Sequence, residues 1–313
     1  MGFQLELIHK MQCGVWDGHR EQQPDKLSVP KLIMQTWKSE SMNDTWRQGQ
    51  QSIMKHMPDW QYVFLTDEAM YAFVKDSYPD LYERFCSLRY SIQRADVLRY
   101  LWLYKYGGLY IDLDYEVMRS FDSLLAAARA PLYVLYSANV RSVLTNSLIM
   151  AIPGLTLFYT LAQQALFGKA PMWAFSRHVY VMSTTGPLAF HSAVVGSGVP
   201  YTVLPHKLFL QGSPVLHDIA SVRARATAHS EQLRETAYTV PLDGGSWNST
   251  DTTIINFLNK HKWTLVTLAS LGVAWFLLHG AHSHMVLRSL QGHLRRALRL
   301  RRLTNGLLNT LDA

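Results

Sequence analysis

The sequence predicts an α/β domain built around a mostly parallel sheet, and three observations lead to this fold class. Apolar residue types make up 48% of the 313 residues and charged types 17%, which is enough to bury a full core. Short apolar runs alternate with segments of helical periodicity. Only Cys13 and Cys86 are cysteines, so neither a disulfide framework nor a paired-cysteine metal site is available. The composition excludes disordered, collagen-like and coiled-coil chains.

The first elements alternate in the order expected of a parallel sheet. Residues 29–37 form an apolar run typical of a buried strand, and residues 44–57 have the apolar spacing of a helix. A second strand is expected at residues 60–65 and a second helix at residues 67–78. No internal repeat or low-complexity linker interrupts this pattern, so we expect one domain.

The most informative block starts with a helix and ends in two acids. Residues 91–106 have helical spacing and stop at a Gly-Gly pair. Residues 109–113 then predict a short strand, and its apolar run ends in two carboxylates, Asp112 and Asp114. Since residues i and i+2 of a strand face the same side, the two carboxylates are expected to converge on one point.

Converging carboxylates indicate a site for a hard divalent cation. Two such groups repel each other unless a cation lies between them, and oxygen ligands favour Mn²⁺ or Mg²⁺. At the carboxyl edge of a parallel sheet, such an ion lies where a diphosphate would bind. The alternative interpretation of the Asp-Leu-Asp triplet is a solvated acidic turn.

The block resembles the glycosyltransferase sugar-binding region with the D-x-D motif of glycosyltransferase family 32. That family includes initiating α-mannosyltransferases and mannosyl-inositol-phosphorylceramide synthases of the yeast type, and it is distantly related to clostridial glucosylating toxins. Residues 29–38 resemble the opening strand of the family, residues 145–147 its T-N segment, and residues 244–247 its late G-S-W element. The resemblance implies a GT-A, Rossmann-like glycosyltransferase domain.

The sequence also departs from the family pattern at several positions. Met34 replaces a usual histidine, and no histidine occurs in the ten residues before Ser246. In the family a late histidine or acid often helps to hold the metal. The third protein ligand therefore stays open, with Asp243, Asn248 and Asp251 as the local candidates.

The resemblance implies catalytic roles for four residues of the central block. Asp114 would bind the metal directly, and Asp112 would contact the ribose or reach the metal through water. Asp96 and Arg99 would lie above the donor pocket, Asp96 toward sugar hydroxyls and Arg99 toward the donor sugar or phosphates. The alternative for the last two is an ordinary helix ion pair, worth a few tenths of a kcal/mol.

Four further residues are implied to bind the donor. Tyr110 would stack on the base or the sugar, although an aromatic residue beside a buried strand is as often part of the core. Asn146 would bind the donor sugar, or else be a turn residue at a strand edge. Trp247, assisted by Ser246, would cover the diphosphate as part of a loop.

The C-terminal part predicts attachment to a membrane. Residues 263–278 are the most hydrophobic stretch, and these 16 residues would make a helix of about 24 Å. A full span needs about 20 residues, so a buried helix of the soluble domain is the alternative. Residues 282–313 carry six arginines against one aspartate, and their leucines recur at helical spacing. This tail is typical of an amphipathic helix on an anionic lipid surface, or else it is a solvated basic tail.

These segments give an expected division of the chain. Residues 1–28 would be an N-terminal arm, residues 29–258 the GT-A domain, residues 259–281 a membrane segment and residues 282–313 a basic amphipathic tail. The positive-inside rule places the tail in the cytosol, yet the N-terminus lacks the apolar core of a signal peptide, so the topology stays open. The expected location is a Golgi or endoplasmic-reticulum membrane. The tail holds +5 of the net charge of +7, so the domain is nearly neutral and nucleic acid is not an expected partner.

The resulting hypothesis is a metal-dependent, retaining glycosyltransferase. It would transfer mannose, galactose or glucose from a nucleotide sugar, GDP-mannose or a UDP-hexose, to a lipid or glycan acceptor at a membrane. The alternatives are a non-catalytic relative that binds sugar nucleotides or acts as a membrane scaffold, and a toxin-like protein glucosyltransferase.

Overall fold

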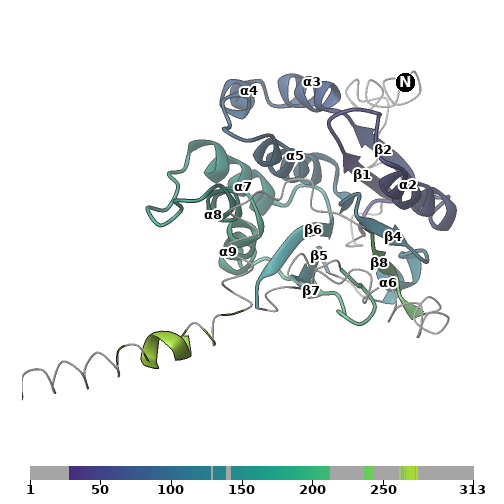
Figure 1. Ribbon diagram of the computed structural model, residues 1–313. Helices are drawn as coiled ribbons and strands as arrows, with labels where there is room; N and C mark the ends of the chain where they lie inside the picture. The colour runs from purple at the N-terminus through teal and green to yellow at the C-terminus, as the bar shows by residue number, and fades with distance from the viewer. Residues whose placement is uncertain are drawn as a thin grey trace, which may run out of the picture. The chain divides into compact units, whose positions relative to one another are not determined.

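The computed structural model separates the chain into two compact units, residues 1–253 and 254–313. The residues that it describes are 28–127, 130–138, 142–211 and 236–242 in the first unit, and 261, 264, 266–271 and 273 in the second. The first unit contains a six-stranded sheet in the order β2-β1-β3-β6-β5-β7 (Figure 1). The strands are β1 (Leu32–Thr36), β2 (Gln61–Leu65), β3 (Gly108–Ile111), β5 (Leu132–Tyr136), β6 (Leu144–Ala151) and β7 (Thr202–Val203).

The sheet is mostly parallel, as predicted. Strand β1 pairs in parallel with both β2 and β3, and β5 pairs in parallel with β7. Strand β6 lies between β3 and β5 and is antiparallel to both. This reversed strand did not follow from the alternation of elements in the sequence.

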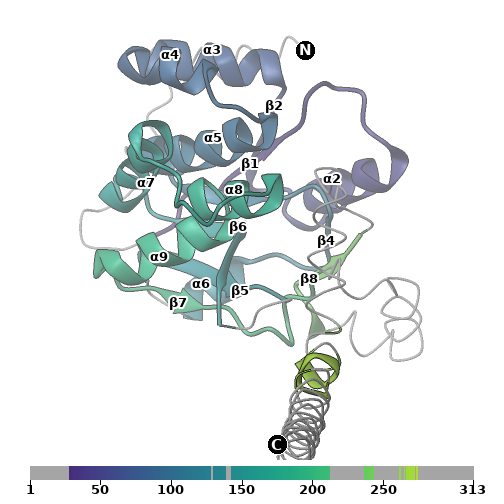
Figure 2. The same cartoon turned by 60° about the vertical axis from the view of Figure 1, so that its left-hand side comes forward.

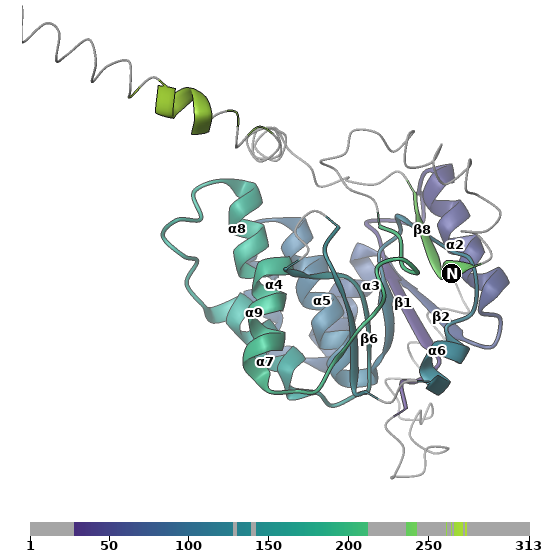
Figure 3. The ribbon, with the colours of Figure 1, turned by 90° about the horizontal axis from the view of Figure 1, so that it is seen from below.

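Helices cover both faces of the sheet. Those of the first unit are α2 (Asp44–His56), α3 (Asp67–Ser77), α4 (Pro79–Cys86), α5 (Ser91–Tyr106), α6 (Asp122–Ala127), α7 (Thr156–Phe167), α8 (Arg177–Thr184) and α9 (Pro187–Ser197). One buried cluster joins α3, α4, α5, α7 and α9 to the sheet, and a second joins α2 to its other face. Figure 3 shows α5, α7 and α9 on one side of the strands and α2 on the other.

Local sequence explains where the predicted helices begin and end. Asn43 and Thr66 accept backbone N–H bonds at the starts of α2 and α3, as side-chain caps do. Helix α5 ends at Gly107, which has a φ of 66°. Gly108 has a φ of 89°, and a Cβ there would lie 2.3 Å from the carbonyl oxygen of Leu32. The Gly-Gly pair therefore lets β3 start directly against β1.

The strand that leads into the acids is shorter than predicted. Strand β3 ends at Ile111, so Asp112 and Asp114 lie in a turn and not on a strand. Between them Leu113 is buried against Trp46 and Phe64, which draws the chain out of the sheet. The expected strand over residues 109–113 was therefore wrong at its carboxyl end.

A small second sheet follows this turn. Strand β4 (Tyr115–Val117) pairs antiparallel with β8 (Thr239–Pro241), and β4 lies beside α2 (Figure 2). The backbone N–H of Leu242 donates to the carbonyl oxygen of Asp114 at 2.8 Å. The late part of the chain is thus tied to the acidic turn.

The C-terminal predictions fall mainly on residues that are not described. Residues 264, 266–271 and 273 are helical. No helix in the described part of the chain is long and apolar enough to cross a membrane. The expected membrane segment at 259–281 lies largely outside the described residues, and the tail at 282–313 lies wholly outside them. The N-terminal arm at 1–28 is described only at its last residue.

Helix α2 packs closely on the acidic turn through Gly49, and this contact is testable. A Cβ on Gly49 would lie 2.7 Å from the carbonyl oxygen of Tyr115 and 3.0 Å from that of Leu113. Gly49→Ala should therefore lower the free energy of unfolding by about 1–3 kcal/mol, because backbone would have to move. Urea unfolding measures the change.

Gly196 in α9 is the matched control, because a Cβ there would meet no atom within 4 Å. Gly196→Ala should leave stability unchanged or raise it by about 0.5–1 kcal/mol, since alanine favours a helix. Equal stability changes for the two variants would contradict the close packing of α2 on the turn.

Candidate functional site

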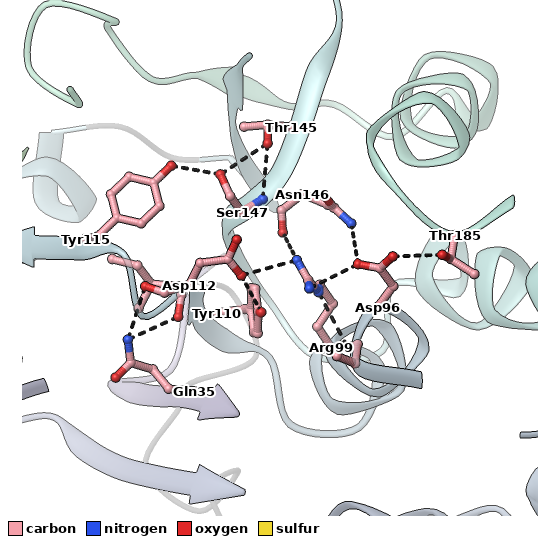
Figure 4. Close-up of polar contacts among 12 residues, drawn as sticks. Gln35, Asp96, Arg99, Tyr110, Asp112, Tyr115, Thr145, Asn146, Ser147 and Thr185 are labelled. Atoms are coloured by element: carbon pink, nitrogen blue, oxygen red, sulfur yellow. Dashed lines mark hydrogen bonds and ion pairs between the residues drawn. The ribbon is translucent and has the colours of Figure 1, made fainter. Parts of the chain in front are cut away.

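Polar side chains gather at the edge of the sheet where β1 and β3 end. Figure 4 shows Arg99 between Asp96 of α5 and Asp112 of the turn, with Asn146 of β6 above them. The parallel strands β1, β2 and β3 all end at this edge. The site therefore lies at the carboxyl edge of the parallel part of the sheet, as predicted.

Asp112 is held by several protein groups. Its backbone N–H donates to the carbonyl oxygen of Ser147 at 2.8 Å. Its Oδ1 accepts from the Tyr110 hydroxyl at 2.5 Å and lies 3.5 Å from a guanidinium nitrogen of Arg99. Burial raises the pKa of Asp112, while Arg99 and Tyr110 oppose that rise. The side chain is still 34% exposed, so this carboxylate is held by protein groups and is also accessible to solvent.

Asp114 has a different environment. Its Oδ1 is buried and has no hydrogen-bond partner among the described residues. Burial, followed by the charge of Asp112, raises the pKa of Asp114 to about 7. A buried carboxylate oxygen without a donor is destabilising unless a cation or proton compensates it. Asp114 is therefore the group of this site most suited to bind a cation.

The acidic turn supplies some of the ligands that a divalent metal ion requires. The carboxylates of Asp112 and Asp114 are close enough for the charge of one to raise the pKa of the other, and one has an unsatisfied oxygen, which is the donor chemistry that Mn²⁺ and Mg²⁺ prefer. In the described ranges, no group of three or more metal-ligating side chains is present. A metal here would need further oxygen ligands, and donor phosphates could supply them.

Arg99 is the centre of the buried network. It is 4% exposed, and one Nη donates to the backbone oxygen of Asn146 at 2.6 Å. Its other Nη lies 3.0 Å from Oδ1 of Asp96. The guanidinium also lies over the ring of Tyr110, 4.2 Å from its centroid. Although burial lowers the pKa of Arg99, Tyr110, Asp96 and Asp112 raise it, so the group stays charged.

Asp96 is fully engaged by protein groups. Its Oδ1 accepts from Nδ2 of Asn146 at 3.0 Å, and its Oδ2 accepts from the Thr185 hydroxyl at 2.7 Å. Asn146 also donates to the Tyr100 hydroxyl at 2.9 Å, and that hydroxyl donates to the carbonyl oxygen of Thr185. Asp96 and Arg99 are thus not an ordinary surface ion pair, because both are buried and joined to other elements.

Tyr110 lies in the core, which was the alternative to a role in donor binding. It is 2% exposed, with Arg99 over its ring and its hydroxyl on Asp112. Met34, where the family has a histidine, is fully buried and pairs in register with Tyr110. Stacking of Tyr110 on a donor stays a prediction that would need its ring to be uncovered.

Two sets of supporting residues were not predicted. Gln35, fully buried on β1, donates to the carbonyl oxygens of Ile111 and Asp112 at 3.2 and 3.3 Å. Its Oε1 accepts from the Tyr62 hydroxyl, which in turn accepts from Gln50 of α2. A glutamine inside an apolar strand was the available signal for this role.

Ser147 and Thr185 form the second unpredicted set. Ser147 binds the backbone of Asp112 and shares a hydrogen bond with the Tyr115 hydroxyl at 2.8 Å, so it holds both ends of the acidic turn. Its place in the T-N-S triplet was a signal for this role. Thr185 is 89 positions from its partner Asp96, and no local pattern marks it.

The late residues expected at the site lie outside the described residues. These are Ser246, Trp247 and the three candidate metal ligands Asp243, Asn248 and Asp251. Their roles stay predictions.

The buried position of Arg99 predicts that this residue is needed for folding. Arg99→Ala should lower the free energy of unfolding by about 3–5 kcal/mol, because it leaves Asp96 buried without its counter-ion. Arg89→Ala is the matched control, since Arg89 is exposed, and its effect should stay within about 0.5 kcal/mol. Chemical unfolding measures both variants. Equal stability of the two would show that Arg99 is not a structural ion-pair partner.

Comparison with known proteins gives the family. Residues 43–131 match the family described as "Glycosyltransferase sugar-binding region containing DXD motif". Inositol phosphoceramide mannosyltransferase 2 of Schizosaccharomyces pombe is 30% identical over 82% of this chain and 67% of its own length. A mannosyl phosphorylinositol ceramide synthase of Saccharomyces cerevisiae is 34% identical over 53% of this chain, but the match spans only 41% of that relative.

Among solved structures, PaToxG Glycosyltransferase is 15% identical with a TM-score of 0.42, over 75% of this chain and 84% of that one. The sequence relatives carry the assignment, and the matched segment contains Asp96, Arg99 and both acids of the turn. The chain belongs to the glycosyltransferase family whose sugar-binding region contains the DXD motif.

Proposed function

We propose that this chain is a metal-dependent, retaining mannosyltransferase that uses a nucleotide sugar and acts on an inositol phosphoceramide-type lipid. The observation that carries the proposal is the pair Asp112 and Asp114 at the carboxyl edge of the sheet, with an unsatisfied oxygen on Asp114. The names of the relatives support mannose as the sugar and a phosphoceramide as the acceptor. In this proposal the domain has the GT-A type of fold.

Asp114 would be the direct metal ligand and Asp112 its fixed neighbour. The unsatisfied Oδ1 of Asp114 gives it a free coordination position, whereas Oδ1 of Asp112 is already taken by Tyr110 and Arg99. Asp112 could still contact the metal, a metal-bound water or the donor ribose through its other oxygen. A bound divalent ion would supply charge neutralisation for the diphosphate leaving group. Both Mn²⁺ and Mg²⁺ suit these ligands.

The buried network would position this pair and close one side of the donor pocket. Asp96, Arg99 and Asn146 are each at most 5% exposed, and protein groups bind both oxygens of Asp96, both terminal nitrogens of Arg99 and the amide nitrogen of Asn146. Direct contact of Asp96 with sugar hydroxyls, or of Arg99 with phosphates, would therefore require an exchange of an existing bond. We propose that the three residues act mainly by fixing Asp112 and the backbone of β6.

A lipid acceptor would bring the active domain to a membrane. The expected hydrophobic segment and basic tail would tether the chain, and a Golgi or endoplasmic-reticulum membrane would contain a ceramide-based acceptor. The relatives fit this assignment, because their names specify phosphoceramide products or acceptors. UDP-hexose donors are an outcome that the donor assay below distinguishes, and a glycan is the alternative acceptor.

The raised pKa of Asp114 predicts a pH-dependent gain in stability for Asp114→Asn without metal. An unfolded aspartate has a pKa near 3.9, and the folded value is about 7. Between about pH 4 and pH 7, Asp114 is therefore protonated in the folded chain but ionised in the unfolded chain. As pH rises through this range, Asp114 lowers the free energy of unfolding of the wild-type chain. In EDTA, Asp114→Asn should raise Tm by roughly 2–4 °C at pH 8 and leave it nearly unchanged at pH 4. Thermal unfolding at the two pH values measures this.

Asp59→Asn, at an exposed acid, is the control and should not change the Tm difference between the two pH values. Added Mn²⁺ should raise the Tm of the wild-type chain and of the control but not that of Asp114→Asn. Stabilisation of all three by Mn²⁺ would contradict Asp114 as a ligand.

The donor is tested with a panel of nucleotide sugars. With Mn²⁺ and inositol phosphoceramide in vesicles, GDP-mannose should release nucleoside diphosphate faster than UDP-glucose or UDP-galactose. EDTA and Asp114→Ala should each abolish the release. Turnover that persists in EDTA, or a preference for a UDP-hexose, would contradict the metal or the mannose assignment respectively.

A further inference from the structure

The connection between α7 and α8, residues 168–176, exposes large apolar side chains. Met172 is fully exposed, Phe175 is 89% exposed and Trp173 is 56% exposed. Figure 1 shows this connection projecting from the helices, away from the sheet. Large apolar side chains that gather on an exposed loop mark an interaction site more often than single exposed ones do. We call residues 168–176 the α7–α8 loop.

The α7–α8 loop has a defined shape. The backbone N–H of Ala174 donates to the carbonyl oxygen of Pro171 at 2.9 Å, which closes a turn with Met172 and Trp173 at its centre. Ser176 then caps α8 by accepting from the N–H of Val179 at 3.2 Å. The two apolar side chains are therefore presented at the tip of a fixed turn.

The charge along the sequence on both sides of the loop points to an anionic surface. No aspartate or glutamate occurs between Ser123 and His217. That stretch contains the basic residues Arg129, Arg141, Lys169, Arg177 and Lys207. In sequence, Lys169 and Arg177 flank the exposed side chains; Arg177 is exposed, and its guanidinium lies 5.0 Å from the centroid of the Tyr90 ring. Tryptophan and phenylalanine between basic residues, with no acid nearby in sequence, is the pattern of a segment that enters the interface of an anionic bilayer.

We propose that the α7–α8 loop docks the domain on an anionic lipid bilayer. Met172, Trp173 and Phe175 enter the interfacial region, and Lys169 and Arg177 contact lipid phosphates. This contact is separate from the hydrophobic segment at residues 259–281. The purpose of this docking, which is to bring the site to a lipid acceptor, rests on the proposed function.

Helix α8 connects the loop to the site. It begins at Arg177 beside the loop and ends at Thr184, next to Thr185, whose hydroxyl binds Asp96. Eight residues of helix span about 12 Å. A lipid headgroup bound at the loop would thus be separated from the buried network by about the length of α8. The length of α8 would then set the distance between the site and the membrane surface.

The depth of the loop in a bilayer tests the proposal with the full chain. Vesicle binding alone is not sufficient, because the C-terminal segment would also bind. A spin label is therefore placed at Trp173→Cys after Cys13→Ser and Cys86→Ser. Its collision rates with oxygen and with a water-soluble nickel complex are measured with phosphatidylcholine vesicles that contain phosphatidylserine. The control label is at Met54→Cys, which is exposed on α2 at the other face of the sheet.

The proposal expects a several-fold rise in the oxygen-to-nickel ratio at position 173 and none at position 54. Vesicles without phosphatidylserine should reduce the rise. A label at 173 that stays as open to nickel as the control on bound vesicles would overturn the proposal. So would a label that is shielded from both reagents without vesicles, because protein would then cover the loop.

A double variant separates docking from chemistry. Trp173→Ser with Phe175→Ser should slow transfer to a vesicle-borne acceptor several-fold and leave metal-dependent donor hydrolysis in solution unchanged. Unchanged transfer would overturn the use of the loop in catalysis. If the wild-type chain hydrolyses no donor, the proposed function fails, whereas the spin-label measurement still decides whether the loop docks.

Discussion

The buried charge of Arg99 is the constraint on which the site depends. A guanidinium with 4% exposure is stable only if its charge and donors are satisfied within the protein. Those partners come from three places: Asp96 on the same helix, the backbone of Asn146 on β6, and Asp112 in the turn. Because one cation satisfies all three, helix α5, the reversed strand and the acidic turn are fixed relative to one another. The position of the D-x-D carboxylates is therefore a result of core electrostatics as well as of strand geometry.

The same network explains why the second acid of the motif is available to a ligand. With three ionised carboxylates, Asp96, Asp112 and Asp114, the single charge of Arg99 leaves an excess of two negative charges in this cluster. Asp112 is close to Arg99 and Tyr110, and so the excess falls mainly on Asp114, whose pKa is raised to about 7. A divalent cation matches that excess in magnitude and sign. The protein thus holds one acid firmly and leaves its neighbour in need of a positive charge.

The sequence predicted those parts of the fold that depend on local pattern. Helix α5, its end at the Gly-Gly pair and the two acids follow from periodicity, glycine chemistry and spacing. The end of β3 did not, because burial of Leu113 against Trp46 and Phe64 turns the chain earlier than the apolar run indicates. Thr185 could not be predicted either, since its bond to Asp96 joins positions far apart in sequence. Gln35 lay within a segment that the family resemblance had already marked, but its role depends on which carbonyl groups the neighbouring strand presents.

Helix α8 connects the chemistry of the site with the proposed membrane contact. One of its ends is next to Thr185, and the other follows the α7–α8 loop. Attachment through the C-terminal segment alone would keep the domain near a bilayer but would not by itself set its orientation. A short rigid helix between the loop and the buried network would fix which edge of the sheet faces the lipid. For an acceptor whose reacting group lies in the headgroup layer, orientation limits the rate as much as proximity does, because the hydroxyl must reach the donor sugar in one geometry. Membrane docking through this loop would therefore act on the same step as the positioning of Asp112 and Asp114.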